Sequence, residues 1–279
     1  IAVSILIGLL VLELGLRLIP GFAPPPTLNQ FDATTGWSKV PGKSITRRVG
    51  NERIHFQINE NGLRDDPGVG PGKAQDSFRV LMLGDSFVLG YTVERADLFV
   101  DQLEGWWKSE GRKVEVVNAG TEGWSTDQEV AWFLDHGKAY QPDLVLLFPY
   151  ENDIYWNGQP RYATDMAKPL FKPDGMPEER TLPEPRKKGV LESSATLGFL
   201  KRAGAWLRSL RGPPPMNPEF GVLLNSPPEG YADWCARTEG ALHALRDGCK
   251  LVGARLVVCP IPSKSAVDPE ERAFFQAWD

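Results

Sequence analysis

Short apolar runs in the middle and late parts of the chain predict its central sheet. They lie at Val80–Leu83, Val114–Val117, Leu144–Phe148 and 255–259, and a single charged residue, Glu115, interrupts the second. Each run has the length of a buried strand, and a continuous apolar run is typical of a strand covered on both faces. The pattern therefore predicts strands of a parallel sheet.

Segments with helical spacing separate these runs. Residues 95–108, 125–139 and 231–251 repeat apolar side chains three or four positions apart. In the first segment we expect the aromatic residues, Trp106 included, to belong to the core. Strands that alternate with helices favour right-handed crossovers in a three-layer α/β/α sandwich with a flavodoxin-like parallel sheet.

The three earlier runs each end in a polar or turn-forming segment. The first is followed by Gly84, Asp85 and Ser86, the second ends at Asn118 to Thr121, and the third at Pro149 to Asp153. Parallel strands end at the same edge of a sheet, where open α/β sheets bind their ligands. That edge would collect the Ser86 hydroxyl, the Gly120 amide and the Asn152 side chain. Taken alone, Gly-Asp-Ser also makes ordinary turns.

These three blocks together resemble the SGNH (GDSL-type) hydrolase family. Gly84-Asp85-Ser86-Phe87, Asn118-Ala119-Gly120 and Asn152-Asp153 are similar to its first three blocks, in the same order and each after a strand. The resemblance implies that Ser86 is a nucleophile. It also implies an oxyanion hole formed by the Ser86 and Gly120 amides and the Asn152 side chain. The supporting residues of these blocks are Gly84, Asp85, Asn118 and Asp153, of which Asp85 and Asp153 shape loops. No metal or organic cofactor is implied.

The chain departs from the family pattern in two places. Tyr150 stands where the third block has glycine, and the fourth block, Asp-x-x-His, is absent. The chain has three histidines, His55, His136 and His243, and none has an aspartate three positions before it. His55 and His136 are expected to be surface residues, and none of the three histidines lies in a sequence setting that suggests it can act as the base. The sequence is therefore interpreted as C-terminally truncated, with the catalytic histidine and aspartate after Asp279.

The first twenty residues differ in character from the rest. Residues 1–12 are almost entirely aliphatic, and Glu13 and Arg17 are spaced to pair across one helical turn. A membrane span needs about 20 apolar residues, so residues 1–20 are predicted to be a transmembrane signal anchor. A buried core helix and a cleaved signal peptide are the alternatives. The anchor would place the catalytic domain on the extracytoplasmic side of the cytoplasmic membrane.

Proline content and periodicity define two further regions of the chain. Residues 21–76 read as a proline-containing spacer and a small β-rich segment, in which residues 53–58 form a half-buried strand with Ile54, Phe56 and Ile58 inward. Residues 77–279 form the SGNH-like domain. Within it, residues 155–228 read as an insertion that serves as a lid, a binding surface or a surface excursion.

The insertion contains one amphipathic segment, residues 193–210. Its predicted inward positions are Leu197, Leu200, Ala205 and Leu207. Its basic residues could face an anionic membrane or polymer, and a solvated face is the default. They are Lys201, Arg202, Arg208 and Arg211.

Composition limits the function classes. The 279 residues carry a formal net charge of −5, which argues against a nucleic-acid partner. The three cysteines show no metal-ligand spacing. The function implied by the resemblance is hydrolysis of an acyl ester of a carbohydrate, lipid or other alcohol. The alternatives are an acyltransferase that acts on an exported polysaccharide or other cell-envelope acceptor, and a non-catalytic binding domain. Substrate and oligomeric state are left open.

Overall fold

The computed structural model describes residues 2–19, 27–163, 165–185, 194–210, 212 and 217–270. Internal contacts divide the chain into two units, one of residues 1–27 with 185–216 and the other of residues 28–184 with 217–279. The two units are described separately below. The predicted domain boundaries stay predictions.

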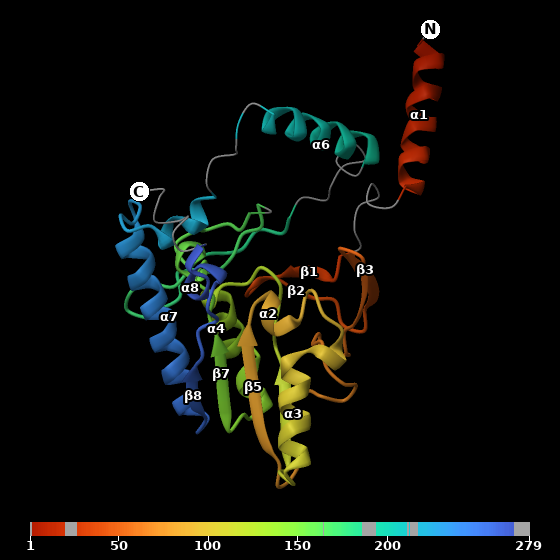
Figure 1. Ribbon diagram of the computed structural model, residues 1–279. Helices are drawn as coiled ribbons and strands as arrows, with labels where there is room; N and C mark the ends of the chain where they lie inside the picture. The colour runs from red at the N-terminus through yellow and green to blue at the C-terminus, as the bar shows by residue number, and fades with distance from the viewer. Residues whose placement is uncertain are drawn as a thin grey trace. The chain divides into compact units, whose positions relative to one another are not determined.

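A four-stranded parallel sheet forms the centre of the larger unit (Figure 1). Its strands are β5 (Phe78–Gly84), β6 (Val114–Asn118), β7 (Leu144–Phe148) and β8 (Arg255–Val258), in the order β6-β5-β7-β8. All four are the strands predicted from the apolar runs. The chain passes from β5 to β6 on one side and then to β7 on the other, so the strand order reverses at β5, as in flavodoxin-like sheets.

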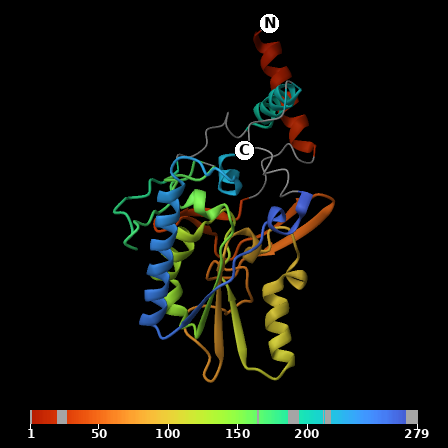
Figure 2. The same ribbon diagram turned by 60° about the vertical axis from the view of Figure 1, so that its left-hand side comes forward.

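Helices cover both faces of this sheet (Figure 2). Helices α4 (Thr126–Asp135) and α7 (Tyr231–Leu251) pack together on one face, and α3 (Phe99–Ser109) lies on the other. Each face has its own apolar core, with Phe133 and Leu245 in one and Val100 in the other. The predicted three-layer α/β/α arrangement is therefore confirmed.

The prediction for Trp106 was wrong. A 3₁₀ turn, η1 (Arg95–Asp97), occupies the start of the predicted helix, and α3 begins only at Phe99. Val100, Leu103 and Trp107 then face the core, at spacings of three and four residues. Trp106 lies on the opposite side of the helix and its side chain is 55% exposed.

Two antiparallel hairpins precede the sheet. They are β1 (Asn29–Asp32) with β2 (Gly36–Lys39), and β3 (Ser44–Val49) with β4 (Glu52–Gln57). Strand β4 alternates as expected, with the predicted inward side chains of Ile54, Phe56 and Ile58 all buried. The short elements α2 (Ser86–Leu89), α5 (Asp153–Trp156), η2 (Gly137–Tyr140), η3 (Pro218–Leu223) and α8 (Lys264–Val267) complete this unit.

The smaller unit contains two helices, α1 (Ala2–Leu18) and α6 (Ala195–Ser209). The predicted pair forms within α1, where Arg17 Nε lies 2.8 Å from Glu13 Oε1. In the part of the chain that the structure describes, no helix has both the length and the apolar character needed to cross a membrane. Helix α1 has 17 residues, whereas a span needs about 20. The predicted transmembrane helix is therefore not confirmed.

Candidate active site

Ser86 is the first residue of α2 and follows directly on the central strand β5. The Asp85 side chain caps this helix by accepting a hydrogen bond from the Phe87 amide at 2.8 Å. At the other end Gly90 adopts a left-handed conformation with φ of 73°, which glycine adopts without strain. The sequence Gly-Asp-Ser thus forms a strand-to-helix turn that presents Ser86 at the carboxyl edge of the sheet.

The half-buried Ser86 lines a cavity of about 300 Å³. The remaining lining residues are polar or aromatic side chains, one glycine and one methionine: Asn29, Trp37, Tyr91, Glu122, Gly123, Tyr162 and Met166. They come from the first hairpin, the turn after α2, the loop after β6 and the predicted insertion. Ser86 is the residue that the sequence predicted as the nucleophile, and the structure places it at the wall of this cavity.

Strand register brings the loop after β6 beside Ser86. Asn118 pairs with Met82 on β5, and the Thr121 amide donates to the Gly84 carbonyl at 3.1 Å. Gly120 therefore lies against the first turn of α2. A β-carbon on Gly120 would stand 2.2 Å from the Leu89 nitrogen, so the close approach requires glycine here.

The Gly120 amide already has an acceptor. It donates to Asn118 Oδ1 at 3.0 Å, while Asn118 Nδ2 donates to the Val88 carbonyl at 2.9 Å. The Asn118 side chain thus ties the loop after β6 to α2. For Gly120 to serve as an oxyanion donor, the oxyanion would have to share this amide with Asn118 Oδ1 or displace the Asn118 side chain from it.

Asn152 lies at the end of β7 and caps α5 without a side-chain hydrogen bond to that helix. Gly84 pairs with Phe148, so β5 and β7 end at the same level. Between them the rings of Phe87 and Tyr150 pack with centroids 5.0 Å apart. Among the described residues, the lining of the Ser86 cavity includes neither Asn152 nor Gly120. Their convergence on one oxyanion position stays a prediction.

The two aspartates of the motif blocks are buried. Burial raises the pKa of Asp85 to about 6, although hydrogen bonds to its carboxylate from the Phe87 amide and the Ser86 side chain oppose the rise. Asp153 accepts hydrogen bonds from Thr126 Oγ1 at 2.9 Å and from the Tyr150 amide at 3.4 Å. Burial and the Asp85 charge raise the pKa of Asp153 well above its ordinary value. Both carboxylates therefore accept hydrogen bonds from neighbouring segments, and their predicted role in shaping the loops stays a prediction.

Further buried charges lie on α4, and the sequence analysis missed them. Both carboxylate oxygens of Glu129 are buried and have no hydrogen-bond partner among the described residues. Burial, followed by the charge of Asp153, raises the pKa of Glu129 well above its ordinary value. Two residues earlier, Asp127 forms a fully buried ion pair with Lys168 of the predicted insertion. Burial raises the pKa of Asp127 and lowers that of Lys168, and their mutual attraction offsets these shifts in part.

A second charged cluster adjoins the Ser86 cavity through Glu122. Its carboxylate pairs with Lys39 and with Arg47, whose Nη2 lies 3.2 Å from Glu122 Oε1. Lys39 also donates to Asn29 Oδ1 at 2.8 Å, and Trp37 Nε1 donates to the Glu122 carbonyl at 3.1 Å. No sequence motif indicates this cluster. Lys39 and Arg47 lie about 80 residues before Glu122 in the sequence, and only the fold brings them together.

None of the three histidines lines the Ser86 cavity. His55 lies on the exposed face of β4, where its ring contacts the Ser44 and Thr46 hydroxyls at 3.3 Å. His136 and His243 have half-exposed side chains at the end of α4 and on α7. The prediction that His55 and His136 are surface residues is confirmed. In the described residues, Ser86 therefore has no histidine positioned to take its proton.

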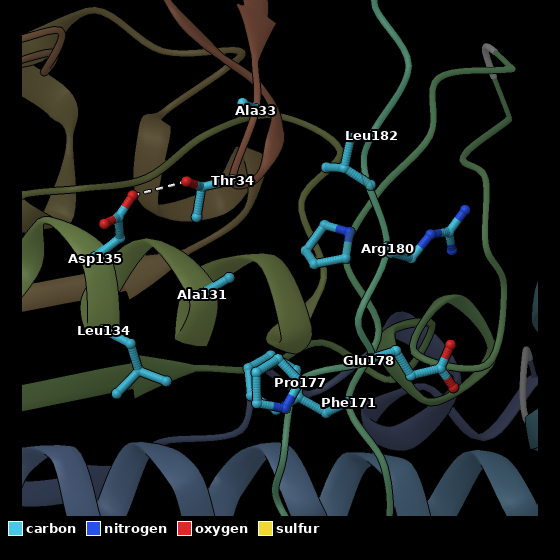
Figure 3. Close-up of a pocket in the computed structure, with 11 residues that line it drawn as sticks. Ala33, Thr34, Ala131, Leu134, Asp135, Phe171, Pro177, Glu178, Arg180 and Leu182 are labelled. Carbon is cyan, nitrogen blue, oxygen red and sulfur yellow. Dashed lines mark hydrogen bonds between the residues drawn. The ribbon is translucent and has the colours of Figure 1, made fainter.

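Other cavities occur in the described part of the larger unit. One, of about 330 Å³, is lined by apolar side chains and Cys259 at the strand ends, among them Phe87, Phe148 and Ile261. Another, of about 390 Å³, lies against α4 (Figure 3). Its lining includes Ala131, Leu134 and Phe171, and Thr34 donates to Asp135 at its edge. A third, of about 330 Å³, has both Ser38 and His136 in its lining. Ser38 lies within strand β2, whereas Ser86 follows Gly84 and Asp85 at the carboxyl end of the central strand, so Ser86 marks the candidate active site.

Comparisons with known proteins give similar solved structures only. No protein-family model matches the chain, and no curated protein sequence matches it. The structure of TesA is 16% identical, with a TM-score of 0.35, and the match covers 71% of this chain and 68% of that one. The psychrotrophic esterase EstA from Pseudoalteromonas sp., inhibited by monoethylphosphonate, is 14% identical with a TM-score of 0.34 and the same coverage. AlinE4, a SGNH-hydrolase family esterase, is 16% identical with a TM-score of 0.28, over 72% of this chain and 94% of that one.

Proposed function

We propose that this chain carries the nucleophile of an SGNH-type serine esterase, which hydrolyses an acyl ester through an acyl-Ser86 intermediate. The observation that carries the proposal is the position of Ser86. It begins a helix at the carboxyl end of the central strand and opens into a cavity. A serine there can be reached by substrate, while its backbone is held by the Asp85 cap and by the packing of Gly120 on α2.

In the proposed reaction, Ser86 Oγ attacks the ester carbonyl carbon and the alcohol leaves. Water then attacks the acyl-Ser86 ester, releasing the acid and restoring the serine. The Ser86 and Gly120 amides and the Asn152 side chain are the proposed donors to the tetrahedral oxyanion, and losing one such donor typically costs about 100- to 1000-fold in rate. A base must take the serine proton, since a free hydroxyl is a poor nucleophile. The predicted base is a histidine after Asp279.

The side chains that line the Ser86 cavity favour a polar substrate that contains a ring. Tyr91 and Tyr162 supply aromatic surface, and Asn29 and Glu122 supply hydrogen-bonding groups. This lining favours a carbohydrate ester among the substrates left open by the sequence. Acyl transfer to an exported polysaccharide uses the same serine chemistry and remains the alternative function, as does a non-catalytic binding role. The extracytoplasmic location is likewise a proposal that the sequence alone supports.

Hydrolysis of p-nitrophenyl acetate tests the proposal. We expect slight turnover by the 279-residue chain and a steep rise in a longer chain that extends through the natural C-terminus. Ser86→Ala should abolish that rise, while Ser109→Ala, which removes an exposed hydroxyl from α3, should leave it unchanged. A longer chain that hydrolyses the ester equally well without Ser86 would refute the proposed nucleophile. Transfer of the acyl group to an added sugar, in place of hydrolysis, would favour the transferase.

A further inference from the structure

Helix α6 has an apolar stripe that the structure leaves exposed. Along a helix of 3.6 residues per turn, its exposed large apolar side chains fall within an arc of about 120°. They are Phe199, Leu200, Trp206, Leu207 and Leu210, and each is at least 40% exposed. Leu200, Ala205 and Leu207 were predicted to point inward, and this prediction was wrong because all three are exposed. A stripe of this width normally packs against a core, so its exposure calls for a partner.

The remaining surface of α6 is positively charged. Lys201 and Arg208 lie on the side opposite the stripe and Arg202 lies beside it, while Ala195–Ser209 contains no acidic residue. The whole chain has a net charge of −5, so this helix is locally cationic in an acidic protein. A basic face opposite a stripe of tryptophan, phenylalanine and leucine is typical of helices that lie in the plane of a membrane surface.

Helix α1 holds the start of α6. Glu13 Oε2 accepts hydrogen bonds from the Ser194 hydroxyl at 2.7 Å and from the Thr196 amide at 2.9 Å. Glu13 Oε1 accepts one from the Ala195 amide at 2.9 Å. These contacts satisfy amides at the helix start that have no partner within the helix, and they lower the pKa of Glu13. They also explain why a carboxylate interrupts an otherwise apolar helix.

We propose that α6 is an in-plane membrane helix that binds an anionic lipid surface. The stripe of Phe199, Leu200, Trp206, Leu207 and Leu210 would enter the boundary between headgroups and acyl chains, with Trp206 at the interface, as is usual for tryptophan. Lys201, Arg202 and Arg208 would lie near anionic headgroups, each strengthening binding about fivefold. The proposal is independent of the catalytic function of Ser86.

Sedimentation of the full chain with lipid vesicles tests the proposal. The probes are vesicles of phosphatidylcholine alone and of phosphatidylcholine with 30% phosphatidylglycerol. Helix α1 also exposes aliphatic side chains, which can bind lipid as well. The contribution of α6 is therefore measured by comparing its variants with the wild type. We expect Trp206→Gln with Leu207→Gln to weaken partitioning onto the anionic vesicles by about tenfold or more. Lys201→Gln with Arg208→Gln should remove most of the preference for the anionic vesicles over the neutral ones.

The matched control is Ala205→Gln, an exposed position on α6 outside the stripe, which should bind like the wild type. Hydrogen exchange should show amides of residues 197–209 protected by anionic vesicles in the wild type but not in the stripe variant.

Equal binding by all variants would assign binding to α1 and overturn the proposal. So would a stripe variant with a clearly lower melting temperature without lipid, since the stripe would then be a packing surface within the protein. Binding to soluble polyphosphate as strong as to anionic vesicles, and insensitive to the stripe variant, would overturn it in favour of a polyanion site.

Discussion

Phe87 and Tyr150 pack their rings with centroids 5.0 Å apart and join the two strand ends at the candidate site. Phe87 follows the proposed nucleophile, and Tyr150 stands two residues before Asn152. In the family that the motifs resemble, the position of Tyr150 is a glycine. In this chain an aromatic contact therefore couples α2 to the loop that carries the proposed oxyanion donor.

A double-mutant cycle measures this coupling. Phe87→Leu and Tyr150→Leu each keep an apolar side chain but remove one ring. We expect a coupling free energy of about 0.5–1.5 kcal/mol in urea unfolding, because a packed aromatic pair contributes this much beyond its buried area. Additive effects of the two substitutions, within about 0.3 kcal/mol, would show that the contact does not stabilise the site.

Gly120→Ala should disrupt the junction between β6 and α2. The added β-carbon would meet the Leu89 nitrogen at 2.2 Å and the Val88 carbonyl carbon at 2.6 Å, and backbone atoms cannot turn away as a side chain can. We expect a loss of about 3 kcal/mol or more in the free energy of unfolding. Gly105→Ala is the control. Gly105 lies inside α3 with nothing within 4 Å of an added β-carbon, so alanine there should stabilise by up to about 1 kcal/mol. Equal effects of the two substitutions in chemical unfolding would contradict the close approach.

Lys168 should anchor its part of the predicted insertion to α4. Lys168→Met leaves the Asp127 carboxylate buried without its partner, which typically costs about 3–5 kcal/mol. Adding Asp127→Asn should recover most of that loss, because the unpaired charge is then removed. Lys108→Met breaks an exposed pair with Glu104 and should change stability by less than about 1 kcal/mol. Thermal and chemical unfolding of the three variants and the wild type measure these differences. No recovery in the double variant would mean that Lys168 acts through packing alone.

Asp85 should make stability depend on pH. Its pKa rises from 3.8 to about 6 on folding, so the folded state binds the proton more tightly than the unfolded state. The stabilisation from that proton is complete below about pH 4 and disappears as the pH rises through about 6, with an upper limit of about 3 kcal/mol. Asp85→Asn keeps a side-chain oxygen for the Phe87 amide and has no proton to lose. It should gain stability relative to the wild type as the pH rises from 4 to 7. A constant difference between the two proteins over this range would contradict the buried carboxyl.

The sequence predicted the sheet well because the strands are continuous apolar runs with polar ends. Val80–Leu83 and Leu144–Phe148 are such runs, and a short apolar segment between turns is typical of a buried strand. The strands that precede Ser86 and Gly120 pair directly, so the residues after them lie close together. The exposure of His55 was also readable, because it falls on the polar side of an alternating strand.

The features that the sequence analysis did not predict depend on contacts between segments that are distant in the sequence. Glu122 meets Lys39 and Arg47 only through the packing of the two hairpins against the loop after β6. Asp127 looked like an ordinary acidic residue in a first helical turn, and its burial depends on Lys168. In α6 the apolar spacing was visible, but spacing alone does not say whether a stripe faces a core or a surface.

The most direct test of the account is covalent labelling of Ser86. The longer chain that extends through the natural C-terminus is treated with an alkyl phosphonate ester carrying a good leaving group, and the labelled peptide is mapped by mass spectrometry. The account predicts one phosphonate adduct per chain, located on Ser86, together with loss of p-nitrophenyl acetate hydrolysis and no adduct in Ser86→Ala. An adduct on another residue, or full hydrolysis that survives in Ser86→Ala, would contradict the claim that Ser86 is the nucleophile.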